Sequence, residues 1–120
     1  MAGSTESVVD NHLQRFGAGD LPGLVADFSE QAVVILPDGV VLRGVEQINA
    51  WYEGLFAEFA KPGASFHLNE KVIEGEIAYI TWAAETADHI YEFATDTFVI
   101  RDGRILIQTI GVKATAKGTS

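Results

Sequence analysis

His12 interrupts an apolar stripe near the start of the chain. Val9, Leu13 and Phe16 recur at the spacing of one helix face, and His12 lies beside them in the sequence. An imidazole that points inward needs a hydrogen-bonding partner or a chemical role, because burying an unpaired polar group costs free energy. Near its ordinary pKa of about 6.5, histidine can give or take a proton at neutral pH. A structural role stays open, in which His12 bonds a buried carbonyl or lies half in water at the edge of the stripe.

Two more polar residues share strand parity with apolar neighbours. Side chains alternate between the two faces of a strand, so Asp96 shares a face with Phe98 and Ile100, and Gln108 shares one with Ile110. If those faces are internal, the carboxyl and the amide point into the core. Two structural alternatives stay open for Asp96: a β-bulge that turns it outward, or a role only as partner of the histidine. Gln108 is equally consistent with a hydrogen-bonding group of the core or of a dimer face.

We expect these three polar groups to converge on one cavity. Its expected apolar walls are Trp51, Phe56, Ile80, Trp82 and Phe98. A concave apolar site with few polar groups is the usual form of a small-molecule pocket. The sequence therefore predicts a ligand site, although tryptophans in such positions are more often plain core residues than ligand platforms, and one residue can be both.

Other candidate motifs carry little weight. Glu85, Asp88 and His89 are potential metal ligands, but they fall at a strand end and a turn, with the spacing of no established site. The glycines at 17–19 follow a helix rather than a strand, which argues against a dinucleotide-binding loop. The chain has no Gly-x-Ser-x-Gly elbow of the kind that serine hydrolases use. We expect no metal site.

Periodicity predicts the elements that must position these groups. Apolar positions at helical spacing predict a first helix that is capped by Ser4 or Thr5 and ends at residues 17–19, a second over 20–28 and a third that ends before Pro62. Short β-branched runs predict strands at 32–36 and 40–43. Longer runs predict four strands, at 65–74, 77–87, 90–101 and 104–112. We expect a single domain over residues 1–112 and a flexible tail over 113–120.

Helices followed by a long meander predict an α+β fold, with the helices on one face of a curved antiparallel sheet. The predicted strand at 90–101 has bulky apolar side chains on both faces, Phe98 on one and Phe93 and Val99 on the other. A sheet that is apolar on both sides needs two covers. We therefore expect a homodimer through the outer sheet face. His67 shares parity with Lys71 and is expected to face solvent or the partner subunit.

Composition restricts the possible partners. The chain has 120 residues, enough for one core, and 17 acidic against 8 basic residues give a net charge of -9. Such a surface repels phosphate backbones and anionic lipid, so we expect neither a nucleic-acid nor a membrane partner. Cysteine is absent, which excludes thiolate chemistry. The opening MAGSTE lacks the basic and apolar regions of a secretory signal, and we expect a cytoplasmic protein.

Several short motifs occur in a characteristic order. They are AGD at 18–20, AVV at 32–34, PDG at 37–39, RGV at 43–45, Gly75 ahead of Trp82, and FVIRDGRI at 98–105. In this order, over about residues 5–112, the chain resembles the SnoaL-like and ketosteroid-isomerase-like members of the nuclear transport factor 2 superfamily. The resemblance implies a cone-shaped α+β barrel, a curved antiparallel sheet wrapped around three N-terminal helices with an apolar pocket between them, and usually a dimer. It implies no single reaction, because this scaffold hosts isomerases, cyclases, hydrolases, dehydratases and non-catalytic binders.

The family's functional positions transfer only in part. Ketosteroid isomerases place a general-base aspartate where this chain has Leu36, so the steroid proton shuttle lacks its base. Their tyrosine oxyanion donor falls on His12, and their second donor, an acid held protonated by an apolar site, falls near Asp96. A pocket position in the last strand falls on Gln108.

We expect a cofactor-independent enzyme for a small apolar carbonyl compound, acting as an isomerase, cyclase or dehydratase. His12 would carry the proton, and Asp96 would orient it or act as the partner acid, a contribution of about 10²–10⁴-fold. The alternative is a non-catalytic ligand-binding or dimeric assembly domain, which the missing base at Leu36 favours.

Overall fold

The computed structural model describes residues 4–118. Local signals begin its first two helices as expected, and the first helix also ends as expected. The Ser4 side chain caps α1 (Thr5–Ala18) by accepting a hydrogen bond from the backbone N–H of Ser7. Gly19 ends α1 in the left-handed conformation, at a φ of 70° that glycine adopts without strain. Asp20 then caps α2 (Leu21–Ala26) by accepting from the N–H of Gly23. Among the described residues, no helix has both the length and the apolar character that crossing a membrane requires.

The remaining elements are one long helix and six strands. They are β1 (Phe28–Ile35), β2 (Val41–Arg43), α3 (Val45–Ala60), β3 (Ser65–Glu74), β4 (Ile77–Glu85), β5 (His89–Arg101) and β6 (Arg104–Ala116). The strands form one sheet in the order β2-β1-β6-β5-β4-β3. Its two end strands do not pair with each other, so the barrel is not closed.

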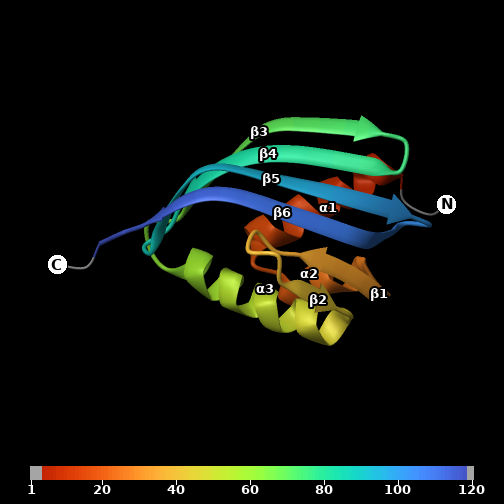
Figure 1. Cartoon of the computed structure of the whole chain (residues 1–120), viewed down its shortest axis with the longest axis horizontal. Helices are drawn as coiled ribbons and strands as arrows, with labels where there is room; N and C mark the ends of the chain where they lie inside the picture. The colour runs from red at the N-terminus through yellow and green to blue at the C-terminus, as the bar shows by residue number, and fades with distance from the viewer. Residues whose placement is uncertain (1–3, 119–120) are drawn as a thin grey trace.

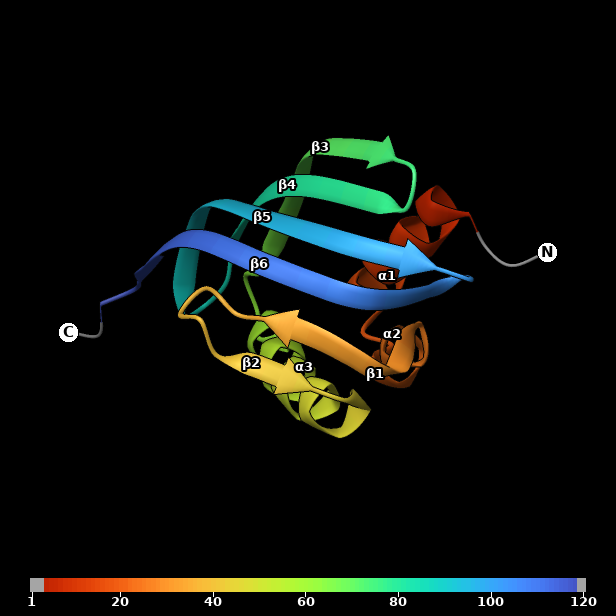
Figure 2. The ribbon, with the colours of Figure 1, turned by 45° about the vertical axis from the view of Figure 1, so that its right-hand side comes forward.

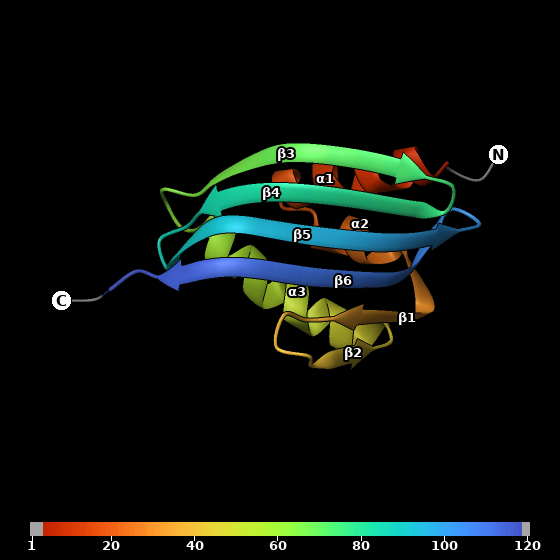
Figure 3. The same cartoon turned by 45° about the horizontal axis from the view of Figure 1, so that its top comes forward.

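The sheet is mixed, whereas we expected an antiparallel one. Strand β1 pairs with β6 in parallel, and the other neighbours are antiparallel. Parallel pairing needs a long connection, and residues 36–103 separate β1 from β6. The α+β cone is otherwise confirmed: the long strands β3 to β6 curve over the helices, which all lie on one side of the sheet (Figures 1 and 3). Figure 2 shows β1 and β2 extending the sheet beside α3.

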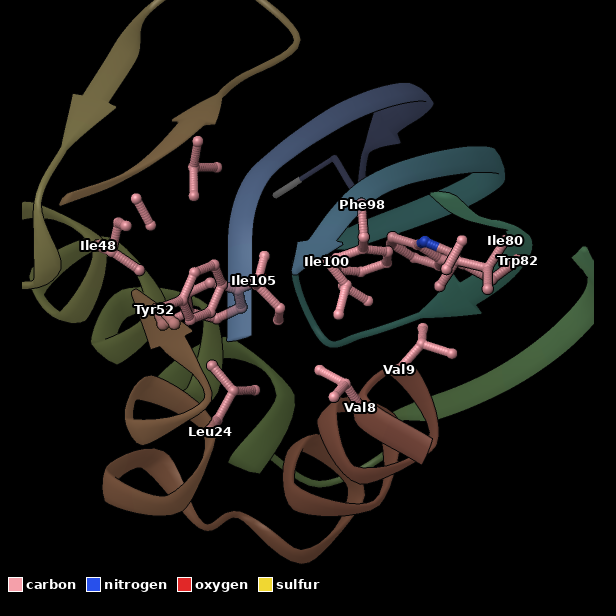
Figure 4. Close-up of a cluster of buried hydrophobic side chains, with 14 of the residues drawn as sticks. Val8, Val9, Leu24, Ile48, Tyr52, Ile80, Trp82, Phe98, Ile100 and Ile105 are labelled. Atoms are coloured by element: carbon pink, nitrogen blue, oxygen red, sulfur yellow. The ribbon is translucent and has the colours of Figure 1, made fainter. Parts of the chain in front are cut away.

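The core lies between the helices and the inner face of the sheet. Figure 4 shows buried side chains from α1, α2 and α3 together with those of β4, β5 and β6. Along the middle of β5, Ala94, Asp96, Phe98 and Ile100 are all buried, so the parity predicted for Asp96 is confirmed. Gln108 of β6 is also buried, opposite Phe98 in the register.

Two boundaries differ most from the sequence prediction. Phe28 begins β1 rather than ending the second helix, because α2 stops at Ala26 and Phe28 pairs with Ile105 of the last strand. Residues 113–116, expected in the flexible tail, are the end of β6 and pair with β5. Residues 1–3 of the predicted domain and 119–120 of the predicted tail lie outside the described residues.

Candidate active site

A cavity of about 380 Å³ lies between the helices and the inner face of the sheet. This volume suits a small organic ligand. Most of its lining is aromatic or aliphatic, and the aromatic side chains are Phe16, Trp51, Tyr52, Phe59, Phe66, Trp82 and Tyr91.

The structure brings most of the predicted site residues to this cavity. Those that line it are His12, Trp51, Ile80, Trp82, Asp96 and Gln108. Phe56 and Phe98, which we predicted to contact the ligand, are not among the lining residues. Phe98 is fully buried behind His12, with its ring centroid 5.0 Å from the imidazole, and Phe56 packs at 5.0 Å against Phe16. Both phenylalanines thus pack against side chains that line the cavity.

His12 is held in a largely apolar surrounding. Its side chain extends from the middle of α1, the residue is 4 % exposed, and it makes edge contacts with the rings of Phe28 and Phe98. Its Nε2 lies 3.5 Å from the Tyr52 hydroxyl, whereas Nδ1 has no hydrogen-bond partner among residues 4–118. Burial lowers the pKa of His12 to about 4, because the charged imidazolium loses hydration there. The imidazole is therefore neutral at pH 7.

Asp96 shows the opposite shift. Oδ2 accepts a hydrogen bond of 3.3 Å from the indole Nε1–H of Trp82, and Oδ1 is buried without a partner among the described residues. Burial raises the pKa of Asp96 to about 7, and the bond from Trp82 opposes the rise only in part. The carboxyl is therefore a neutral acid below about pH 7, with one buried oxygen that has no partner among the described residues.

Tyr52 is a site residue that the sequence analysis did not identify. Its hydroxyl donates a 2.8 Å hydrogen bond to Oε1 of Gln108 and approaches His12 from α3. Burial, followed by the nearby charge of Asp96, raises the pKa of the Tyr52 hydroxyl well above its usual value. One signal was available: a buried tyrosine hydroxyl usually finds a partner, and Tyr52 lies on the apolar face of its helix. Its pairing with Gln108 depends on the distance between α3 and β6, which the sequence pattern does not contain.

The residues considered as metal ligands form separate pairs. The carboxylate of Glu85 pairs with Lys117 at 2.6 Å, and that of Asp88 pairs with Lys61 at 2.8 Å. His89 binds Glu58 through Nδ1 at 2.9 Å. Each of these side chains thus has its own partner, as expected of groups at a strand end and turn.

A family model described as the SnoaL-like domain matches residues 9–107, most of the chain. This chain belongs to the SnoaL-like family. No curated protein matches it significantly.

Solved structures with the same fold have low sequence identity to this SnoaL-like chain. One is the epoxide hydrolase/cyclase-like enzyme SalBIII of pyran ring formation in salinomycin, at 14 % identity and a TM-score of 0.80, covering 94 % of this chain and 95 % of that one. Another is a candidate polyketide cyclase from Sinorhizobium meliloti, at 23 % and 0.72, covering 87 % and 93 %. A third is a candidate ketosteroid isomerase from Kribbella flavida, at 12 % and 0.76, covering 97 % and 82 %. These likenesses show the nuclear transport factor 2-like fold.

The charges around the cavity of this SnoaL-like domain restrict what it can bind. None of the described residues that line it is a lysine or arginine, and Asp96 is the one carboxylic acid among them. A carboxylate or phosphate inside would have no counter-charge and would face Asp96. Leu36, at the position of the isomerase base, packs against the apolar core. Of the described residues that line the cavity, His12 and Asp96 are the two whose pKa values, about 4 and about 7, would let them exchange a proton near neutral pH.

Proposed function

We propose that this SnoaL-like protein is a cofactor-independent enzyme that enolises a small, neutral, apolar carbonyl compound, with His12 as the base and Asp96 as the acid. The observation that carries the proposal is the pair of buried atoms, Nδ1 of His12 and Oδ1 of Asp96, left without partners in residues that line one cavity. Burial shifts the two pKa values in opposite directions, to about 4 and about 7. Between these values the base is unprotonated and the acid protonated, the forms that the reaction needs.

The proposed step moves two protons. Asp96 donates its proton to the carbonyl oxygen while Nδ1 of His12 removes a proton from the adjacent carbon. The C–H electron pair becomes the C=C bond of an enol, leaving an imidazolium and a carboxylate whose opposite charges attract in an apolar surrounding. Return of the proton to another carbon gives isomerisation. Attack of the enol on an electrophilic carbon gives cyclisation, and loss of a β-hydroxyl gives dehydration.

Two features favour a neutral substrate of this kind. The lining, as far as residues 4–118 form it, lacks a cation that could pair with an acidic substrate, and its aromatic rings suit a flat apolar molecule. The cyclase and isomerase names of two fold neighbours support the same reaction class.

The experiment measures carbon acidity directly and needs no knowledge of the natural substrate. 1-Tetralone, a neutral bicyclic ketone, is incubated with the protein in D₂O at pH 6, and loss of its α-hydrogens is followed by proton NMR. We expect faster exchange with the protein than in buffer, and a loss on the order of 10²-fold in His12→Ala and in Asp96→Asn. His67→Ala, which removes an exposed imidazole, is the matched control and should exchange at the wild-type rate.

Two results would count against the proposal. One is exchange that depends on neither His12 nor Asp96. The other is binding of the ketone without any acceleration, which would support the ligand-binding alternative that Leu36 favours.

A further inference from the structure

We infer that Tyr52 and Gln108 are positioning residues that fix the tautomer of His12, with the proton on Nε2 and a bare lone pair on Nδ1. This inference deepens the proposed function and rests on it for its catalytic meaning. It assigns to the two residues a role in presenting the base, through the chain Gln108–Tyr52–His12 that joins β6, α3 and α1.

The Tyr52 hydroxyl has a single proton to donate. That proton is donated to Oε1 of Gln108 over 2.8 Å, a short bond to an oxygen that can only accept. The Tyr52 hydroxyl therefore has no second proton for His12.

The Tyr52 oxygen lies 3.5 Å from Nε2 of His12 and has lone pairs left to accept a hydrogen bond. The tautomer with the proton on Nε2 places an N–H against that oxygen. The other tautomer would oppose two lone pairs there and would leave an Nδ1–H buried without an acceptor. A buried donor without a partner is costly, so the Nε2–H form is favoured.

Water and other side chains have little access to the three residues of this hydrogen-bond chain. His12, Tyr52 and Gln108 are 4 %, 2 % and 1 % exposed, and the other rings against His12 belong to Phe28 and Phe98, which offer no acceptor. The hydrogen-bond chain is thus enclosed by protein. The lone pair on Nδ1 is therefore present before any ligand binds, on an atom that is itself buried.

The test is NMR of the protein labelled with ¹⁵N-histidine at pH 8, where imidazole nitrogens with and without a proton resonate far apart. The chain has three histidines, and the other two are internal references. His89 donates from Nδ1 to the Glu58 carboxylate, so it should show the opposite tautomer, and exposed His67 should show averaged signals. For His12 we expect the Nε2–H form in at least about tenfold excess.

Two variants test directly how Gln108 and Tyr52 affect the tautomer of His12. Gln108→Met removes the acceptor and frees the Tyr52 proton to turn toward His12, after which either tautomer leaves one buried donor without a partner. The excess of the Nε2–H form should therefore be lost, and ketone exchange should fall with it. The double variant Gln108→Met with Tyr52→Phe offers Nε2 no oxygen, so it should show the same loss. A merely structural role for Gln108 would lower stability without changing the tautomer ratio. Amide spectra report whether each variant folds.

The outcomes separate this inference from the proposed function. Wild-type protein with the proton on Nδ1, or a Gln108→Met variant whose tautomer is unchanged, overturns the inference even when ketone exchange is fast. The expected tautomer in the wild type and the loss of its excess in Gln108→Met, in a protein that accelerates no exchange, would support the positioning and contradict the enzymatic function.

Discussion

At the scale of single residues, burial acts on His12 and Asp96 in opposite directions because their charged forms differ in sign. The histidine side chain becomes neutral by losing a proton, whereas the aspartate side chain becomes neutral by gaining one. An apolar surrounding therefore makes both groups neutral over the same range, from about pH 4 to about pH 7. In water their order would be reversed, and the neutral pair would be a minor species.

This reversal predicts a bell-shaped dependence of ketone exchange on pH, measured below saturation so that the pKa values of the free protein are reported. The rate should rise near pH 4, as His12 loses its proton, and fall near pH 7, as Asp96 ionises. Asp96→Asn should lose the alkaline limb together with most of its rate. A wild-type rate that is flat from pH 5 to 9 would exclude Asp96 as the acid.

The same carboxyl predicts how stability depends on pH. Its folded pKa is raised from 3.8 to about 7, so the folded state holds the proton more tightly than the unfolded chain. Its stabilising contribution is complete below about pH 4 and is lost as the pH rises through about 7. At 1.36 kcal/mol per pKa unit, the loss is at most on the order of 4 kcal/mol.

Asp96→Asn, which cannot ionise, should therefore gain stability relative to wild type as the pH rises from 4 to 8. Urea denaturation at several pH values measures this difference. His12 adds a separate loss of stability at low pH, because its pKa is lowered, but that loss is common to both proteins and cancels in the comparison. A constant difference between the two proteins would show that Asp96 is not buried as a neutral acid.

At the scale of elements, strand parity predicted the site where strands are regular and was wrong where they bulge. The register of β5 is unbroken from Ala94 to Val99, so counting in twos placed Asp96 inward correctly. In β3 the pairing register shifts between Leu68 and Glu70, so residues beyond the shift lie on the face opposite to the one that counting in twos predicts. Lys71 was expected on the face of His67, but its ammonium group instead binds carboxylates of α1. Caps and periodicity thus predicted the helices, whereas bulges, the bond between Tyr52 and Gln108 and the pKa shifts depend on distances across elements.

One contact between elements should matter for stability. At the end of α3, Oε2 of Glu58 accepts hydrogen bonds from Thr86 at 2.6 Å, His89 at 2.9 Å and Tyr91 at 2.8 Å, which joins the helix to the turn between β4 and β5. These bonds lower the pKa of Glu58 despite its partial burial, so they favour the carboxylate. The bond to Tyr91 also fixes the position of a ring in the cavity wall.

Glu58→Ala should destabilise the protein by about 1–3 kcal/mol, because three donors lose their acceptor. Glu53→Ala, on an exposed position of the same helix, is the matched control and should change the urea midpoint little. Equal midpoints for the two variants would mean that solvent replaces Glu58 without cost.

At the scale of the whole molecule, the outer face of the sheet is rich in apolar side chains. Ile77 and Tyr79 of β4, Phe93 of β5 and Ile107 of β6 are exposed there, on the side opposite the helices. An apolar surface of this kind is rare on a monomer. The inner face has its cover in the helices, and the outer face has none within the described residues.

We therefore propose a homodimer through this face, which would put two copies of the 13.0 kDa chain together. Phe93→Lys should shift the protein to monomer in sedimentation at micromolar concentration, because a charge would be buried without a partner at the interface. Val40→Lys is the matched control: Val40 is 49 % exposed against 48 % for Phe93, but it lies in the turn between β1 and β2 and should leave the dimer intact. Wild-type protein that sediments as a monomer at these concentrations would remove the proposed interface.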